Sequence, residues 1–201
     1  MRGRDPALKI VVVTSSSKKA GKSTLAAYLV KELGASSAIK VSAGGSHPTR
    51  DAVVTDVGQL ASPGTDTAAL LGAGAKKVAW VNTTKEEAGA GLARALKGMP
   101  PGVLVIEGNS AVESISADFT VFLMAVPFED FKPSATAALS KADLVMVNRS
   151  GKLGDLDLRE LKKEIRGRAP DAEQVFYRPP RDGALAFEKA AKQARKSLGL
   201  D

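Results

Sequence analysis

The residues best suited to chemistry lie in one short stretch, Ser15 to Thr24, with the sequence SSSKKAGKST. Its last four residues, GKST at 21–24, match the second half of the phosphate-binding pattern G-x-x-x-x-G-K-[ST]. In that pattern glycine lets the backbone pass close to a phosphate, lysine neutralises the β- and γ-phosphates, and the hydroxyl is a ligand for Mg²⁺. The stretch therefore predicts a loop that binds a nucleotide, ATP or GTP, together with Mg²⁺.

The loop departs from the pattern at its first glycine, where this chain has Ser16. The residues predicted to bind the nucleotide are Ser17, Lys18, Lys19, Ala20, Gly21, Lys22, Ser23 and Thr24. Lys18 and Lys19 either add positive charge over the phosphates or are solvated lysines of a surface loop. An ordinary basic turn would have a similar composition, but the apolar run before the loop and the apolar-periodic segment after it favour strand, phosphate-binding loop and helix.

Apolar strands alternate with helical segments along the chain. Strands are predicted at residues 8–14, 38–42, 77–82, 103–106, 119–126, 144–148 and 173–177, with a minor strand at 53–55. Helices are predicted at 21–34, 66–73, 85–96 (capped by Thr84), 134–140, 156–167 and 184–198, whereas 43–63 has no clear helical period. This alternation indicates βαβ units. We therefore expect an α/β fold: a single P-loop NTPase domain over residues 1–201, with a mainly parallel sheet of about seven strands and helices on both faces.

In such sheets, ligands gather beyond the carboxyl ends of the strands. Glu107 follows the apolar strand 103–106 and is predicted to orient Mg²⁺ or a water molecule, with a helix-capping or solvated carboxylate as the alternative. Asn148 ends the strand 144–148 and either contacts a base or serves as a turn residue. The aspartate of the guanine-reading motif N-K-x-D is replaced by Gly151, so no strong guanine preference is expected through this motif.

Composition narrows the function classes. The 201 residues carry a formal net charge of +7 and no cysteine, which suits a polyanionic ligand and excludes disulfides and thiolate sites. Basic residues alternate with acidic ones, as in 159–166, so nucleic-acid binding is not expected. No apolar run approaches the ~20 residues that span a bilayer, which favours a cytoplasmic protein without a membrane partner. His47 is the only histidine, which excludes a His-rich zinc site and disfavours a serine hydrolase.

Several pieces of the chain, taken together, resemble one family. They are GKST at 21–24, Lys40 after a short strand, His47 in a polar loop, GTDT at 64–67, AGA at 73–75 and EG at 107–108. Their order over residues 8–110 resembles the molybdopterin-guanine dinucleotide biosynthesis protein B family, a branch of the P-loop NTPases. Residues 142–148 and 157–165 look more generally like metallochaperone GTPases. The chain departs from the family at Ser16, where glycine is usual, and at Asn109, where an aromatic residue is usual.

The resemblance implies a parallel-sheet P-loop fold that binds Mg²⁺ and nucleotide, often as a homodimer, and it places Asp66 near the metal and the phosphates. Metal ligands are thus expected at Ser23, Asp66 and Glu107, and catalytic roles at Lys22, Asp66 and Glu107. We expect a slow NTPase that serves cofactor biosynthesis with a small-molecule or protein partner. Two alternatives stay open. One is a small-molecule kinase whose loops 44–51 and 127–133, with Arg50 and Lys132, bind the acceptor. The other is a nucleotide-gated adaptor with little turnover.

Overall fold

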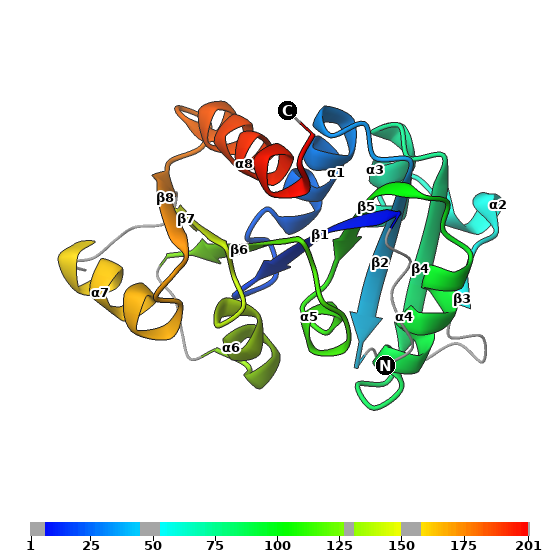
Figure 1. Cartoon of the computed structure of the whole chain (residues 1–201), viewed down its shortest axis with the longest axis horizontal. Helices are drawn as coiled ribbons and strands as arrows, with labels where there is room; N and C mark the ends of the chain where they lie inside the picture. The colour runs from blue at the N-terminus through cyan, green and yellow to red at the C-terminus, as the bar shows by residue number, and fades with distance from the viewer. Residues whose placement is uncertain (1–6, 45–52, 127–130, 150–157, 201) are drawn as a thin grey trace.

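The structure is a computed structural model that describes residues 7–44, 53–126, 131–149 and 158–200. Among these residues, eight strands form one sheet (Figure 1). The strands are β1 (Leu8–Ser15), β2 (Ser37–Ala43), β3 (Val53–Val54), β4 (Lys77–Thr83), β5 (Gly102–Glu107), β6 (Phe119–Ala125), β7 (Leu144–Asn148) and β8 (Glu173–Tyr177). Their order across the sheet is β3-β4-β2-β5-β1-β6-β7-β8. Every neighbouring pair is parallel except β3 and β4, so the predicted α/β fold with a mainly parallel sheet is confirmed.

Helices cover both faces of the sheet (Figure 1). One face carries α1 (Lys22–Glu32), α2 (Val57–Leu60), α3 (Asp66–Gly72) and α8 (Gly183–Leu198). The other carries α4 (Ala88–Lys97), α5 (Ala111–Ser114), α6 (Pro133–Leu139) and α7 (Leu158–Arg168). Strand β1 shows why the strands look continuously apolar in sequence: Val11 and Val13 are buried under the first set, and Ile10 and Val12 under the second. Because parallel pairing and two covered faces leave only the strand ends free, polar chemistry is confined to those ends.

The central position of β1 decides where the site forms. Strand β1 pairs with β5 on one side and with β6 on the other. The loop that follows β1 therefore begins in the middle of the carboxyl edge of the sheet, and α1 follows directly from it. In the described part of the chain, no helix combines the length and the apolar character needed to cross a membrane.

Three segments differ from the sequence predictions. The stretch 43–63 contains the four-residue helix α2 in its described part, and a second four-residue helix, α5, follows β5. Helices this short show no periodicity from which to predict them. Helix α4 begins at Ala88 rather than at residue 85, because Thr84 forms a turn in which its Oγ1 accepts from the Glu87 N–H at 3.4 Å. Thr84 is thus not the cap of this helix.

Candidate functional site

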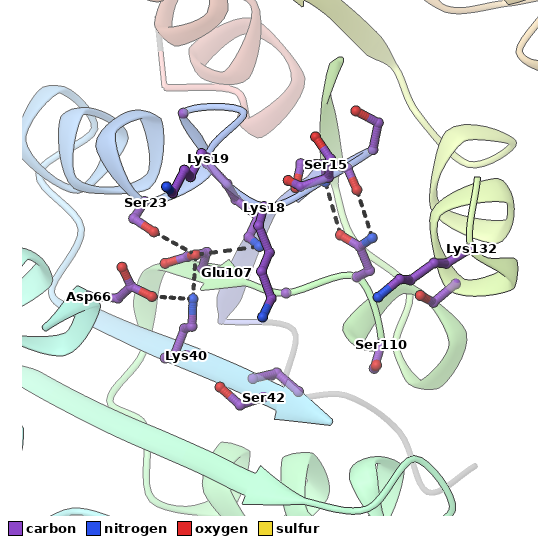
Figure 2. Close-up of a pocket in the computed structure, with 18 of the residues that line it drawn as sticks. Ser15, Lys18, Lys19, Ser23, Lys40, Ser42, Asp66, Glu107, Ser110 and Lys132 are labelled. Atoms are coloured by element: carbon purple, nitrogen blue, oxygen red, sulfur yellow. Dashed lines mark hydrogen bonds and ion pairs between the residues drawn. The ribbon is translucent and has the colours of Figure 1, made fainter. Parts of the chain in front are cut away.

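A pocket of about 990 Å³ opens at the carboxyl edge of the sheet, beside the loop that follows β1 (Figure 2). The predicted nucleotide-binding residues that line it are Ser17, Lys18, Lys19, Gly21, Lys22, Ser23 and Thr24. Ala20 is buried beneath the loop and does not line the pocket. Asp66 and Glu107, from two other elements, line it as well. The fold thus brings together the loop and both carboxylates that the sequence singled out.

The loop reaches α1 through two residues with positive φ. Gly21 directly precedes the helix with φ +97°, a conformation that suits glycine. Lys19 has φ +64° and is the one non-glycine residue with positive φ among those described. Ser16, in the place of the first glycine of the pattern, needs no such freedom, and its N–H continues the pairing with β6 by donating to the Leu123 carbonyl at 2.9 Å. Serine is therefore compatible with this position.

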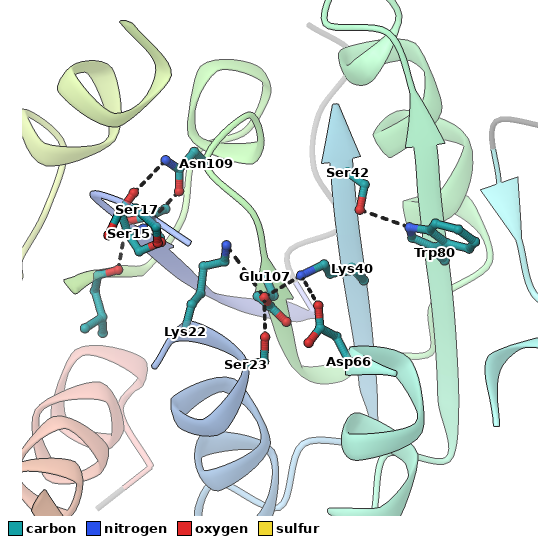
Figure 3. A network of polar contacts seen from close by, with 12 residues as sticks. Ser15, Ser17, Lys22, Ser23, Lys40, Ser42, Asp66, Trp80, Glu107 and Asn109 are labelled. Carbon is teal, nitrogen blue, oxygen red and sulfur yellow. Dashed lines mark hydrogen bonds and ion pairs between the residues drawn. The ribbon is translucent and has the colours of Figure 1, made fainter. Parts of the chain in front are cut away.

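Glu107, itself buried, lies at the centre of a partly exposed charge cluster (Figure 3). It is the last residue of β5, and its side chain is 0 % exposed. Its Oε1 accepts from the Ser23 hydroxyl at 2.9 Å and from Lys40 Nζ at 2.5 Å, with Lys22 Nζ 3.7 Å away. Lys40 Nζ is also 2.5 Å from Asp66 Oδ2. One carboxylate therefore gathers the serine and the lysine of the GKST motif together with a second lysine from β2.

Two strands and the first residue of a helix position these groups. In the parallel pairing of β2 with β5, Lys40 lies directly opposite Glu107, so both side chains leave the same face of the sheet. Asp66 is the first residue of α3, whose start is fixed by Thr65: its Oγ1 accepts from the Ala68 N–H at 3.2 Å. Such a side-chain cap satisfies one free N–H of the first turn and sets where the helix begins. The cap therefore holds Asp66 above the end of β2.

Burial and charge shift the pKa values of three members of the cluster. Burial, followed by the charge of Lys40, lowers the pKa of Lys22 from its usual value despite the attraction of Glu107. Burial also acts to lower the pKa of Lys40, but Glu107 and Asp66 outweigh burial and raise it. For Asp66, burial acts to raise the pKa, and the hydrogen bond and charge of Lys40 outweigh it, so the pKa is lowered. The cluster thus holds Lys40 charged and Asp66 ionised at neutral pH.

The oxygen atoms of the cluster fit a hard divalent cation. Glu107 Oε2 is buried and makes no hydrogen bond within the described residues, so it is available to a metal ion or a water molecule. The Ser23 hydroxyl and the Asp66 carboxylate add two further oxygen ligands. Within those same ranges, no group of three or more His, Cys, Asp or Glu side chains could enclose a metal. Protein sites usually bind Mg²⁺ through one or two carboxylates plus phosphate oxygens and water, and the oxygen atoms of Ser23, Asp66 and Glu107 suit a site of that kind.

Sequence reasoning missed two residues of the site. Lys40 entered only as part of a resemblance, and Asn109 only as a departure from one. Asn109 lines the pocket and bonds to the main chain of Ser15. The signal for both lies in the sheet register, which sets β2 beside β5 and β5 beside β1, and no local pattern carries that information.

Other predicted residues are not brought to the pocket. Asn148 ends β7, is aligned with Tyr177 of β8, and does not line the pocket, so its contact with a base stays a prediction. His47, Arg50 and Gly151 lie outside the described residues, as do the segments 45–52, 127–130 and 150–157.

Lys132, the other candidate acceptor contact, does line the pocket, at the start of α6 (Figure 2).

Comparisons with known proteins agree on the fold. No protein-family model matches the chain, and no curated protein matches it in sequence. The hydrogenase maturation factor HypB from Archaeoglobus fulgidus is similar in structure, with a TM-score of 0.64 at 16% identity over 96% of this chain and 91% of that one. HypB from Helicobacter pylori in complex with nickel gives 0.60 at 14% identity, over 96% and 88% of the two chains.

A third similar structure is the ATP complex of Cyanothece McdA(D38A), with a TM-score of 0.50 at 14% identity, over 97% of this chain and 98% of that one. At such identities the likeness concerns the fold and not the activity. The sheet order, the loop after β1 and these neighbours agree: the chain has the P-loop NTPase fold.

Proposed function

We propose that the protein binds a nucleoside triphosphate with Mg²⁺ at the loop 15–24 and turns it over slowly. The observation that carries the proposal is the convergence of Lys22 and Ser23, at the start of α1, on one carboxylate oxygen of the buried Glu107. A basic loop and a helix N-terminus favour phosphate, while a buried carboxylate beside a hydroxyl favours a hard metal ion. An ordinary surface turn would have no need to bury an ionisable side chain at its base.

Each residue has a distinct role in this proposal. Lys22 and the N–H groups at the start of α1 bind the phosphates and neutralise their charge. Ser23 and Asp66 hold Mg²⁺, which when bound stabilises the charge on the transferring phosphoryl group. Glu107 either ligates the metal through Oε2 or accepts a hydrogen bond from the attacking water.

The test is a calorimetric titration of ATP and GTP, each with Mg²⁺, against the wild type and Lys22→Ala. Charge-assisted hydrogen bonds contribute about 1.5–3 kcal/mol each, so affinity should fall by roughly tenfold or more. Lys31→Ala, an exposed lysine at the other end of α1, is the matched control and should bind like the wild type. Equal affinity of Lys22→Ala and the wild type would remove the P-loop assignment.

The same titration tests the base. Because Gly151 stands where guanine-specific proteins have aspartate, ATP should bind at least comparably to GTP. A site that lacks the matching polar group cannot discriminate strongly between the bases. GTP binding tighter than ATP by about a hundredfold would contradict this expectation.

For the biological role, we propose a cofactor-biosynthesis protein similar to the molybdopterin-guanine dinucleotide biosynthesis protein B family. In support, Lys40, Asp66 and Glu107, which belong to the resembling elements, lie in one cluster. A single cytoplasmic domain over residues 1–201, forming a homodimer and binding a small-molecule or protein partner but neither nucleic acid nor membrane, belongs to the same proposal.

A small-molecule kinase is the second candidate, because the pocket extends beyond the loop. Ser110 and Lys132 line its opposite wall, which leaves room and a positive charge for an acceptor (Figure 2). Phe131 and Ser134 line the same pocket. Product analysis separates the candidates: free phosphate formed with water alone indicates an NTPase, and phosphate on an added metabolite indicates a kinase. Nucleotide binding with almost no turnover would instead indicate a nucleotide-gated adaptor.

A further inference from the structure

The position between the two candidate metal-binding carboxylates is taken by a side chain of the protein itself. Lys40 Nζ lies 2.5 Å from Glu107 Oε1 and 2.5 Å from Asp66 Oδ2, so one ammonium group bridges them (Figure 3). Its side chain is 13 % exposed, and Lys40 lines the pocket. A cation that touched Glu107 Oε1 and Asp66 Oδ2 together would have to share this place with the ammonium group or displace it.

The charges of the cluster already balance. Lys22 and Lys40 supply two positive charges, and Asp66 and Glu107 supply two negative ones, with Lys22 paired to Glu107 and Lys40 paired to both carboxylates. A divalent ion entering alone would meet two lysines beside a buried carboxylate, in a partly buried site where like charges repel more strongly than in water. An ion that arrives with a nucleoside triphosphate brings its own negative charge, and the phosphates give both lysines a new partner in the pocket.

We infer that Lys40 is an internal cation that occupies the metal position of the nucleotide-free protein, so that the carboxylates take up Mg²⁺ only together with phosphates. The inference rests on the proposed function and adds a role for Lys40, which turns from the carboxylates toward the phosphates when the nucleotide binds. The structure favours such a turn because the Lys40 side chain lies on the pocket wall, on the same face as the loop and α1.

A purely structural role for Lys40 is the rival explanation, and the two differ in what removal of the charge does. If Lys40 only holds the fold, its loss leaves two uncompensated carboxylates and lowers stability, and metal ions bring no recovery. If Lys40 occupies the metal position, its loss uncovers a place for a cation, which binds there without nucleotide and restores the stability lost.

The experiment measures binding of Mn²⁺ alone, without nucleotide, by electron paramagnetic resonance, together with the Tm at each Mn²⁺ concentration. The proteins are the wild type and Lys40→Met, which keeps the approximate length of the side chain. If the methionine variant does not fold, Lys40→Gln, which keeps hydrogen-bond donors, takes its place. Removal of a unit charge at contact distance should tighten Mn²⁺ binding by about tenfold or more and make the Tm rise with Mn²⁺. The gain should disappear in the double variant Lys40→Gln/Glu107→Gln.

Lys132→Met is the matched control, because Lys132 lines the same pocket on its opposite wall. It should bind Mn²⁺ like the wild type. Mn²⁺ binding by the Lys40 variants no tighter than by the wild type would overturn the inference, and so would an equal gain in Lys132→Met. Nucleotide is absent from every sample, so the Mn²⁺ measurement tests the role of Lys40 alone. The proposed function is tested separately, by the nucleotide titration of Lys22→Ala.

Discussion

The side-chain amide of Asn109 bonds to both main-chain polar groups of Ser15. Its Oδ1 accepts from the Ser15 N–H at 2.9 Å, and its Nδ2 donates to the Ser15 carbonyl at 2.8 Å (Figure 3). Ser15 ends β1, and Asn109 lies two residues after Glu107, so the pair joins the entrance of the phosphate loop to the strand that carries the buried carboxylate. Asn109, one of the two departures from the pattern of the resembling family, thus bonds to the residue directly before Ser16, the other departure.

Asn109→Ala should destabilise the protein and weaken nucleotide binding together. It leaves the N–H and carbonyl of Ser15, a residue only 3% exposed, without these partners, which costs about 1–3 kcal/mol per unsatisfied group. Urea unfolding gives the stability, and ATP titration gives the affinity. Ser110→Ala changes the next residue of the same pocket wall and should leave both values near those of the wild type. An Asn109→Ala protein as stable as the wild type would show that these two hydrogen bonds do not contribute to the free energy of unfolding.

Glu107→Gln should reduce turnover more than nucleotide affinity, because the shape is kept while the charge that faces Ser23 and the two lysines is lost. Hydrolysis or phosphoryl transfer is measured across a Mg²⁺ titration. Glu113→Gln, an exposed glutamate of α5, is the control and should keep the wild-type rate. Wild-type turnover in Glu107→Gln at every Mg²⁺ concentration would show that the charge of Glu107 has no role in the reaction.

Gly108→Ala should destabilise the protein by about 1–3 kcal/mol, the usual range for overpacking a well-packed core. A Cβ at this position would lie 2.6 Å from the Val41 carbonyl oxygen, and the φ of +142° is unfavourable for any side chain. Gly167→Ala, in open space on α7, should instead be neutral or stabilising by a few tenths to about 1 kcal/mol. Chemical denaturation compares the two, and equal effects would contradict the close approach of β5 to β2.

Lys19→Gly should unfold at higher denaturant than Lys19→Ala. Both variants lose the same charge, but alanine keeps the side-chain strain of φ +64°, which costs about 1–2 kcal/mol for an L-residue, and glycine relieves it. The comparison therefore isolates the backbone from the phosphate contact. Equal unfolding midpoints would mean that Lys19 carries no strain.

Because the phenol of Tyr177 is buried, the free energy of unfolding should fall at alkaline pH. Burial raises the pKa of Tyr177 to about 12, above its ordinary value of about 10. Below about pH 10 both states are protonated and the contribution is complete; as the pH rises from there through the folded pKa, only the unfolded chain loses the proton and stability falls. Unfolding of the wild type and Tyr177→Phe across this range should show the steeper loss in the wild type. Parallel curves would place the phenol in contact with water.

The sequence predicted what local patterns determine. Each of the seven main strands is an apolar run and appears in the sheet, and the GKST motif lies where a strand-loop-helix order requires. The antiparallel strand β3 was predicted only as a minor strand, since two residues carry little pattern. Glu107 was found because a carboxylate after four buried residues is visible in one segment.

Contacts between distant segments could not be predicted. The bridge from Lys40 to Glu107 depends on β2 lying beside β5 with these two residues opposite one another, although β3 and β4 come between the two strands in the chain. The bond from Asn109 to Ser15 depends likewise on the pairing of β5 with β1. Strand order and register are decided by the packing of the whole sheet, so no window of sequence contains them.

The position of β1 between two later strands has a consequence for synthesis of the protein. Both neighbours of the phosphate-loop strand, β5 and β6, are translated after it, and β5 begins only at Gly102. At about 5–20 residues per second, the ribosome needs on the order of ten seconds to bring β5 to its partner. During that time β1 has two unpaired apolar edges, which are the features that nascent-chain chaperones protect. The nucleotide site therefore forms late in folding, although its motif precedes both partner strands in the chain.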